Sequence, residues 1–252
     1  MSEFGKAILV TGVLGGVGSA LREQFEKGGY YVIGTDILPD SRGDSSSFFQ
    51  VDLSKFVTDP HLRREFRAQI VDWLNHRGVR LQGIVNNAAV QILGGVEDLS
   101  LQDFEDTLRV NLSAPLMLTQ LFLPELKGSR GSIINIGSIH AKLTKADFVS
   151  YATSKSALRG LTQAMAVDLG AQGIRVNVIE PAALGTEMLK AGFEGKSDQL
   201  VQLQNYHPTG KIGDPAEVAK LSVFLMSPDC PFMTGAVVPL DGGIGVRLHD
   251  PD

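Results

Sequence analysis

A tyrosine and a lysine four residues apart, Tyr151 and Lys155, form a pair that can exchange a proton with a substrate hydroxyl. They stand at the start of a segment with helical apolar spacing, so both side chains are expected on one face of a helix. A phenol with a pKa of about 10 is a weak base at neutral pH, but a nearby ammonium favours the phenolate and is expected to lower that pKa. Because this spacing often arises by chance, the pair alone does not define an active site.

Two further polar residues strengthen the case for an active site. Ser138 follows the apolar stretch 133–136 and is expected at the carboxyl edge of a parallel sheet, where its hydroxyl can hydrogen-bond a substrate oxygen. Asn111 lies inside a helical segment, either as an exposed polar position or as an amide that holds a water near Lys155. The candidate catalytic residues are therefore Asn111, Ser138, Tyr151 and Lys155.

A glycine-rich turn near the N-terminus is typical of dinucleotide binding. It reads Thr11-Gly12-Val13-Leu14-Gly15-Gly16-Val17-Gly18 and stands between an apolar stretch and a helical one. Glycines at such a turn let the backbone approach a pyrophosphate, whose charge then lies at the positive end of the helix. A turn of this kind also forms for conformational reasons alone, so the glycines leave both interpretations open.

Asp36 adds a second element of a dinucleotide site. It ends the second apolar stretch, at the distance from the glycines expected of a carboxylate that accepts hydrogen bonds from the adenosine ribose hydroxyls. The alternative is that Asp36 only caps a turn. A carboxylate there repels a ribose phosphate, and Gly15 and Ile37 offer no cation to hold one, so the sequence predicts NAD rather than NADP.

A parallel sheet would bring these residues together, and the chain has the elements for one. Short apolar stretches alternate with longer segments of helical spacing, which predicts an α/β, Rossmann-like, doubly wound parallel sheet of six to seven strands flanked by helices in a single domain. The predicted strands are 7–10, 31–34, 83–85, 132–136, 174–179 and 236–238, with 48–51 as a weaker one, and the predicted helices are 17–27, 60–76, 101–126, 151–169 and 215–226.

Two stretches interrupt the alternation. Residues 39–47, rich in Asp, Ser and Gly, are expected to form a solvated loop. Residues 186–213 have few sustained apolar stripes, and they form either a substrate lid or a mobile surface excursion.

Composition limits the possible partners. The 252 residues fit one domain, and a net charge of −5 without a basic run argues against nucleic acid or an anionic membrane as a partner. The N-terminal apolar stretch is too short to export or anchor the chain, so a cytoplasmic location is expected. The single cysteine, Cys230, can form no internal disulfide and has no partners for a metal cluster, so we expect a reducing compartment and no metal site.

Taken together, the motifs resemble those of the short-chain dehydrogenase/reductase family in its compact single-domain form, from about Lys6 to Gly243. Each motif alone is modest, but the set is highly specific in this order and at these separations. The matching motifs are Thr11-Gly-x-x-x-Gly-x-Gly18, Asp52-Leu53, Asn86-Asn-Ala-Ala89, Asn111, Ser138, Tyr151-x-x-x-Lys155, Pro181 with Thr186, and Asp241-Gly-Gly243.

The resemblance implies a role for each matched position. It makes Tyr151 the acid/base, Lys155 the group that lowers the tyrosine pKa and binds the nicotinamide ribose, Ser138 the group that orients the substrate oxygen, and Asn111 the support of a water relay. It also implies a cofactor site in which Asp52 and Leu53 lie by the adenine, Asn87 and Ala88 by the adenosine ribose, and Leu184 and Thr186 by the nicotinamide carboxamide. The full set of cofactor residues is Gly12, Leu14, Gly16, Val17, Gly18, Asp36, Asp52, Leu53, Asn87, Ala88, Ala89, Tyr151, Lys155, Pro181, Leu184 and Thr186.

Three positions depart from the family pattern. Ala89 and Ala182 stand where glycine is usual, so the backbone there must tolerate a methyl group. Glu180 stands where a small or apolar residue is common. It either contacts the substrate or pairs with a nearby cation.

The substrate is expected to border Ser138, His140, Gln91 and Tyr151, a polar set that favours a secondary alcohol such as a sugar or polyol derivative. His140 can equally be a structural histidine. An alternative activity is that of a 3-ketoacyl-thioester reductase, which shares the catalytic residues. A non-catalytic dinucleotide sensor is the remaining alternative, but it would not need an acid/base.

The resemblance also implies an oligomer. Related proteins are mostly tetramers built through two long helices, here 101–126 and 151–169, which predicts a homotetramer or a homodimer. Apolar stripes on such helices are also ordinary core. The residues compatible with the interface are Leu116, Leu118, Leu121 and Phe122.

Overall fold

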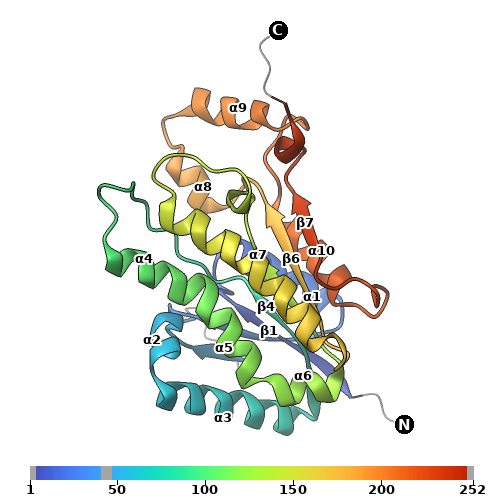
Figure 1. The fold of residues 1–252 in the computed structure, drawn as a ribbon. Helices are drawn as coiled ribbons and strands as arrows, with labels where there is room; N and C mark the ends of the chain where they lie inside the picture. The colour runs from blue at the N-terminus through green and yellow to red at the C-terminus, as the bar shows by residue number, and fades with distance from the viewer. Residues whose placement is uncertain (1–3, 41–46, 249–252) are drawn as a thin grey trace.

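A seven-stranded parallel sheet with helices on both faces forms the centre of the molecule (Figure 1). The computed structural model describes residues 4–40 and 47–248. The strand order is β3-β2-β1-β4-β5-β6-β7, which confirms the predicted doubly wound sheet and includes the weaker stretch as its edge strand. The strands are β1 Gly5–Thr11, β2 Tyr31–Asp36, β3 Phe48–Gln50, β4 Val79–Asn86, β5 Ser132–Ile136, β6 Arg175–Pro181 and β7 Val237–Leu240.

Ten α-helices lie in the described residues, and two buried layers separate them from the sheet. Leu9 of β1 shares one layer with residues of α3, α5 and α7, whereas Ile8 shares the other with residues of α1 and α10. Both faces of the central strands are therefore apolar, as a parallel sheet requires. The helices are α1 Gly16–Lys27, α2 Leu53–Thr58, α3 Pro60–Arg77, α4 Leu101–Leu108, α5 Ala114–Leu121, α6 Leu123–Ser129, α7 Val149–Gly170, α8 Glu187–Gly192, α9 Ser197–Tyr206 and α10 Pro215–Met226.

The segment 101–126, expected to be one helix, is interrupted twice. A π-helical turn, η1 (Arg109–Ser113), separates α4 from α5, and a break at Phe122 separates α5 from α6. Each interruption directly precedes a helix that has a proline in its first turn, Pro115 in α5 and Pro124 in α6. Proline lacks the N–H that would bond to the carbonyl four residues earlier, so the regular helical ladder cannot continue through either position.

Three helices fall where the sequence did not predict them. Helix α2 has six residues, too few to show an apolar period. Helices α8 and α9 lie within 186–213, beyond the carboxyl ends of the strands (Figure 1). No residue of α9 is buried, which is why this segment lacks an apolar stripe.

The segment 186–213 is fixed at its base although its helices are superficial. The amide of Gly185 donates to the carbonyl of Gly213 at 2.9 Å, and the amide of Gly213 donates to the carbonyl of Ala183 at 2.9 Å. These bonds close the excursion where it leaves and rejoins the sheet. Most of the other predicted loop, 39–47, lies outside the described residues.

Candidate active site

The carboxyl ends of β1 and β4 are joined at the point where the strand order reverses, the usual ligand site of an open α/β sheet. The Thr11 hydroxyl accepts hydrogen bonds from the amides of Asn87 (3.0 Å) and Ala88 (2.9 Å). The side-chain amide of Asn87 donates in return to the carbonyls of Thr11 (2.9 Å) and Gly12 (3.0 Å). The glycine turn is therefore fixed to the Asn-Asn-Ala-Ala segment, and the hydroxyl of Thr11, the first residue of the matched motif, makes two of the connecting bonds.

Glycine is required at two positions of the turn for steric reasons. Gly12 has φ +65°, and a Cβ there would lie 2.9 Å from the Cα of Ala88. A Cβ at Gly18 would overlap the carbonyl of Gly12. Gly15, in contrast, has only the Gly12 oxygen nearby, at 3.6 Å from such a Cβ, so the space before α1 remains open. The turn thus exposes backbone at a helix N-terminus, which is what a bound pyrophosphate needs.

Asp36 lies against this turn. Its carboxylate accepts hydrogen bonds from the amides of Leu14 (3.1 Å) and Leu38 (3.2 Å). The second bond is the turn cap that the sequence left as an alternative, and the first brings the carboxylate to the glycine turn. Both interpretations of Asp36 are thus compatible with one geometry.

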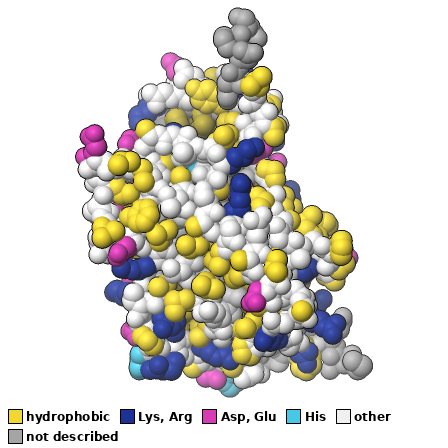
Figure 2. Space-filling model, viewed as in Figure 1, with side chains coloured by type: hydrophobic (Ala, Val, Ile, Leu, Met, Phe, Trp, Pro, Cys, Tyr) yellow, Lys and Arg dark blue, Asp and Glu magenta, His cyan; other side chains and the backbone are white. Residues whose placement is uncertain are grey.

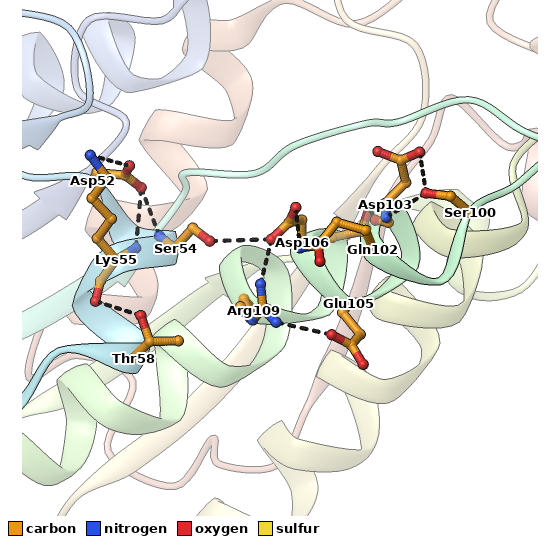
Figure 3. A network of polar contacts seen from close by, with 11 residues as sticks. Asp52, Ser54, Lys55, Thr58, Ser100, Gln102, Asp103, Glu105, Asp106 and Arg109 are labelled. Atoms are coloured by element: carbon orange, nitrogen blue, oxygen red, sulfur yellow. Dashed lines mark hydrogen bonds and ion pairs between the residues drawn. The ribbon is translucent and has the colours of Figure 1, made fainter.

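Asp52 begins helix α2 and belongs to a polar network that reaches the catalytic side (Figure 3). Its carboxylate accepts hydrogen bonds from the amides of Ser54 (2.9 Å) and Lys55 (3.4 Å), and Leu53 is buried. The Ser54 hydroxyl donates to Asp106 at 3.5 Å, and Arg109 at the start of η1 donates to the same carboxylate at 2.6 Å. The network links α2 to the π-helical turn that carries Asn111.

Tyr151, Lys155 and Ser138 converge at the carboxyl end of β5. The Lys155 ammonium donates to the carbonyl of Ile136 at 2.7 Å and lies 5.6 Å from the centre of the Tyr151 ring. Ser138 follows Ile136 by two residues, and its hydroxyl lies close enough to the Tyr151 phenol to lower the pKa of that phenol. The first two turns of α7 and the end of β5 therefore bring three of the four candidate catalytic side chains together.

The pKa values at this centre differ from the sequence expectation. Burial raises the pKa of the Tyr151 phenol, and the nearby Ser138 hydroxyl opposes that effect only in part. Burial also lowers the pKa of Lys155 from 10.5 to about 8. The expectation that Lys155 lowers the pKa of Tyr151 is therefore not met by the chain's own groups, because desolvation is the largest effect and the opposing one comes from Ser138.

Asn111 is buried in η1, so the exposed interpretation of this residue is wrong. Its side-chain carbonyl accepts from the amide of Val90 at 2.8 Å, and its NH₂ group donates to the Val90 carbonyl (2.9 Å) and the Ser154 hydroxyl (3.0 Å). Both N–H donors are thus engaged, which leaves one acceptor position of Oδ1 for a water. Asn111 joins the loop after β4 to α7 beside Lys155.

His140 stands beside the tyrosine. Its ring stacks on Phe148 with the centroids 4.4 Å apart, and it meets the Tyr151 ring edge-on at 5.7 Å. Burial, with a smaller effect of Lys145, lowers the pKa of His140, so the imidazole is neutral at pH 7. Gln91, the other expected substrate residue, is exposed on the loop after β4.

The end of β6 and the segment after it supply the remaining positions. Thr186 caps α8, and its methyl group lies near Gly16, where a Cβ would approach it to 3.0 Å. Pro181 ends β6, and Leu184 forms an isolated bridge with Gly213. Glu180, left open between substrate and cation, pairs with Arg159 of α7. The sequence analysis missed Arg159, although it lies one helical turn beyond Lys155 on the same face.

Residues 12–245 match the family described as enoyl-(acyl carrier protein) reductase. The chain is 32% identical to mouse L-fucose dehydrogenase over 95% of this chain and 88% of that protein. It is 30% identical to the 3-oxoacyl-[acyl-carrier-protein] reductase FabG of Vibrio cholerae, over 97% and 99% of the two chains. The chain belongs to the short-chain dehydrogenase/reductase family, as its motifs predicted, and is an oxidoreductase acting on CH–OH groups.

Solved structures agree with this assignment. The ligand-free aldohexose dehydrogenase of Thermoplasma acidophilum superposes with a TM-score of 0.87 at 29% identity, over 99% of this chain and 98% of that one. A 3-ketoacyl-(acyl-carrier-protein) reductase from Brucella melitensis complexed with NADH gives 0.80 at 25% identity, over 97% and 100%. The protein ElxO with NADP bound gives 0.85 at 26% identity, also over 97% and 100%.

The described residues contain neither a group of metal-binding side chains nor a helix that could span a membrane. No three His, Cys, Asp or Glu side chains gather there as a metal would need. No helix among those described combines the length and apolarity of a membrane span.

Lys155→Met should change the pH dependence of stability. The folded pKa of Lys155, about 8, lies below its unfolded value of 10.5, so between these values the unfolded chain holds a proton that the folded chain has lost. The free energy of unfolding of the wild type should therefore rise relative to that of the variant by up to roughly 3 kcal/mol across this window, and the difference should be constant below pH 7.

Urea unfolding from pH 7 to 10 measures this difference. Lys220→Met, which removes an exposed lysine of α10, is the matched control. Identical pH dependence in the two variants would show that Lys155 carries no such burial cost.

Proposed function

We propose that this protein is an NAD-dependent dehydrogenase that interconverts a secondary alcohol and a ketone by hydride transfer, with a sugar or polyol derivative as substrate. The observation that carries the proposal is the meeting of Tyr151, Ser138 and Lys155 at the same sheet edge as the glycine turn and Asp36. Support from similarity comes from relatives that are themselves L-fucose and aldohexose dehydrogenases.

In the proposed site, the glycine turn and the neighbouring strand ends would hold the dinucleotide. Asp36 would accept hydrogen bonds from the adenosine ribose hydroxyls, and Lys155 has two N–H donors beyond the one given to Ile136 with which it would bind the nicotinamide ribose. A nicotinamide ring supplies a hydride acceptor and, when oxidised, a positive charge that favours the phenolate. The residues proposed to hold the cofactor remain Gly12, Leu14, Gly16, Val17, Gly18, Asp36, Asp52, Leu53, Asn87, Ala88, Ala89, Tyr151, Lys155, Pro181, Leu184 and Thr186.

The proposed proton path starts at the substrate hydroxyl. The Tyr151 phenolate accepts the hydroxyl proton as the carbinol carbon loses its hydride, and the phenol returns the proton in the reverse direction. Ser138 donates a hydrogen bond to the substrate oxygen. Since its own amide is largely engaged, Asn111 acts chiefly by fixing α7 and by holding a water at Oδ1.

The substrate class rests on the surroundings of Tyr151. His140 is fixed by stacking and shares a hydrogen bond of 3.1 Å with Thr144 through Nδ1, so Nε2 is the atom left for a substrate hydroxyl. Gln91 can add an amide from the loop after β4. Similarity to FabG keeps a 3-ketoacyl-thioester reductase as the second candidate.

A substrate panel tests the reaction. Purified protein with NAD should reduce the cofactor in the presence of at least one sugar, polyol or hydroxy acid, followed by absorbance of NADH. Tyr151→Phe should lower kcat by at least about a hundredfold, since general acid–base catalysis contributes that much, while NADH binding stays near the wild-type value. Turnover of only 3-hydroxyacyl thioesters, the alcohol form that can give a hydride to NAD, would favour the second candidate, and cofactor binding without turnover would favour a sensor.

Asp36 should determine the preference for NAD over NADP. The wild type should prefer NAD. Asp36→Asn should shift the ratio of kcat/KM for NAD and NADP towards NADP by roughly tenfold or more, because it removes a negative charge that repels the ribose phosphate by about 1–2 kcal/mol. The amide oxygen of Asn can still accept from Leu14, so the variant leaves the turn intact, whereas Asp36→Ala removes both effects. A wild type that prefers NADPH would contradict the argument.

We also propose a homotetramer in the cytoplasm. Cys230, buried and unpaired, is compatible with a reducing compartment. Figure 2 shows hydrophobic side chains among polar ones over α4, α5 and α7, where Leu116 is 36% and Val167 is 86% exposed. Two residues expected at the interface, Leu118 and Phe122, lie instead in the core because they face the sheet.

Val167→Glu tests the assembly. Val167 stands exposed on the outer face of α7, so a charge there should leave the fold intact but oppose packing against a second copy. Sedimentation velocity at micromolar concentration should show the wild type larger than a monomer and the variant smaller than the wild type. Val201→Glu, on the exposed face of α9, is the control, and a monomeric wild type would rule out the oligomer.

A further inference from the structure

We propose that the Arg159–Glu180 ion pair positions the catalytic groups. It fixes the first turns of α7 relative to the carboxyl ends of β5 and β6. This inference rests on the proposed function, because it assigns a role in the same reaction. Glu180 is one of the positions at which this chain departs from the family pattern. The role of the pair follows from the groups that lie next to it.

The pair is bidentate, with a buried carboxylate and a partly exposed guanidinium. The Arg159 Nε donates to one oxygen of Glu180 at 2.8 Å and an Nη donates to the other at 2.5 Å. The side chain of Glu180 is 6% exposed and that of Arg159 30%. The hydrogen bond to Glu180 raises the pKa of Arg159, as expected when a carboxylate favours the charged guanidinium. Two parallel N–H···O bonds fix distance and orientation together, which a single bond does not.

Glu180 lies on the backbone that carries the catalytic groups. A Cβ built on Gly137 would come within 3.0 Å of the Glu180 Cγ, so the glutamate stem covers this glycine. Gly137 stands between Ile136, whose carbonyl binds the Lys155 ammonium, and Ser138, whose hydroxyl lies close to the Tyr151 phenol. The amide of Gly137 also donates to the carbonyl of Ile179 at 2.7 Å. Glu180 is thus in contact with the short segment that holds both partners.

Arg159 connects this segment to α7. It lies one turn after Lys155 and two turns after Tyr151, so all three side chains project from the same face of the helix towards the sheet. Among the described residues, the hydrogen bond that holds Lys155 on the strand side goes to a neutral carbonyl, a weak anchor for a buried ammonium. The ion pair adds a second, charged anchor between the same helix and the neighbouring strand.

Small shifts of this helix would matter for the reaction. Misplacement of a reacting group by about 1 Å can lower a rate a hundredfold. Loss of the pair should therefore lower kcat more than it changes cofactor affinity, since the glycine turn and Asp36 lie on other elements. A purely structural pair would lower stability without this separation.

A second bidentate pair in the molecule provides a matched control. Arg67 of α3 donates to Glu125 of α6 at 3.0 and 2.8 Å, and the two side chains are 32% and 19% exposed. Arg67→Met and Arg159→Met therefore each remove a guanidinium group that forms a bidentate pair, although Arg67 also donates to the carbonyl of Leu121 at 3.1 Å. Only the second change lies beside the catalytic segment.

The experiment compares Arg159→Met, Arg159→Lys and Arg67→Met with the wild type. We expect Arg159→Met to lower kcat by roughly tenfold to a hundredfold, with the Kd for NADH changed less than about threefold. Amide hydrogen exchange should accelerate in residues 149–156 of this variant and not of Arg67→Met. Arg159→Lys keeps the charge but not the fork, so it should recover only part of kcat.

The outcomes separate the two proposals. A wild type without turnover on the whole panel removes the proposed function and this inference with it. With an active wild type, equal kcat in Arg159→Met and Arg67→Met, or unchanged exchange in residues 149–156, overturns the inference alone. If Arg159→Met does not fold, the partial kcat of the folded Arg159→Lys variant decides, and full wild-type activity there overturns the inference.

Discussion

The hydrogen bond from the Lys155 ammonium to the carbonyl of Ile136 joins the helix that carries the phenol to the strand that leads to Ser138. A buried ammonium with a single neutral acceptor is unfavourable by itself, and the depressed pKa of Lys155 measures that cost. The bond persists because α7 packs against the sheet along much of its length, with Leu158, Met165 and Leu169 buried beneath it. Packing of α7 thus holds the Lys155 ammonium at a position that its hydrogen bond to Ile136 could not maintain alone.

Hydrogen bonds between polar side chains also connect the neighbouring strands to each other and to α7. Asn86 of β4 donates to Asn135 of β5 at 2.8 Å, and Asn135 donates to the Thr162 hydroxyl of α7 at 2.8 Å. Leaving a buried amide without a partner costs about 1–3 kcal/mol, so this chain of bonds selects one register of strand and helix. It lies in the layer below the catalytic groups and connects the same two elements, β5 and α7.

The cofactor end and the substrate end of the site are held by different contacts. At the cofactor end, Thr11, Asn87 and Asp36 are tied by several main-chain bonds, and the network through Ser54 and Asp106 links α2 to η1. At the substrate end, α8 and α9 are held at the base of their excursion, and Arg247 donates to the carbonyls of Asn205 (2.7 Å) and Tyr206 (3.2 Å) at the end of α9. Relatives of this chain differ in the substrates for which they are named, as L-fucose dehydrogenase and the 3-oxoacyl-[acyl-carrier-protein] reductase FabG do.

The parts that follow local rules could be predicted from the residues alone. The periods of the strands and helices predicted the sheet, the spacing of Tyr151 and Lys155 predicted that both lie on one helix face, and the glycines marked the turn in which Gly12 has a positive φ. What depends on partners distant in the chain required the folded structure. The amides around Asn111, the cation beside Glu180, the burial of Leu118 and Phe122, and the raised pKa of Tyr151 all arise from contacts between separate elements. Burial and charge act through space, so no residue pattern along the chain specifies them.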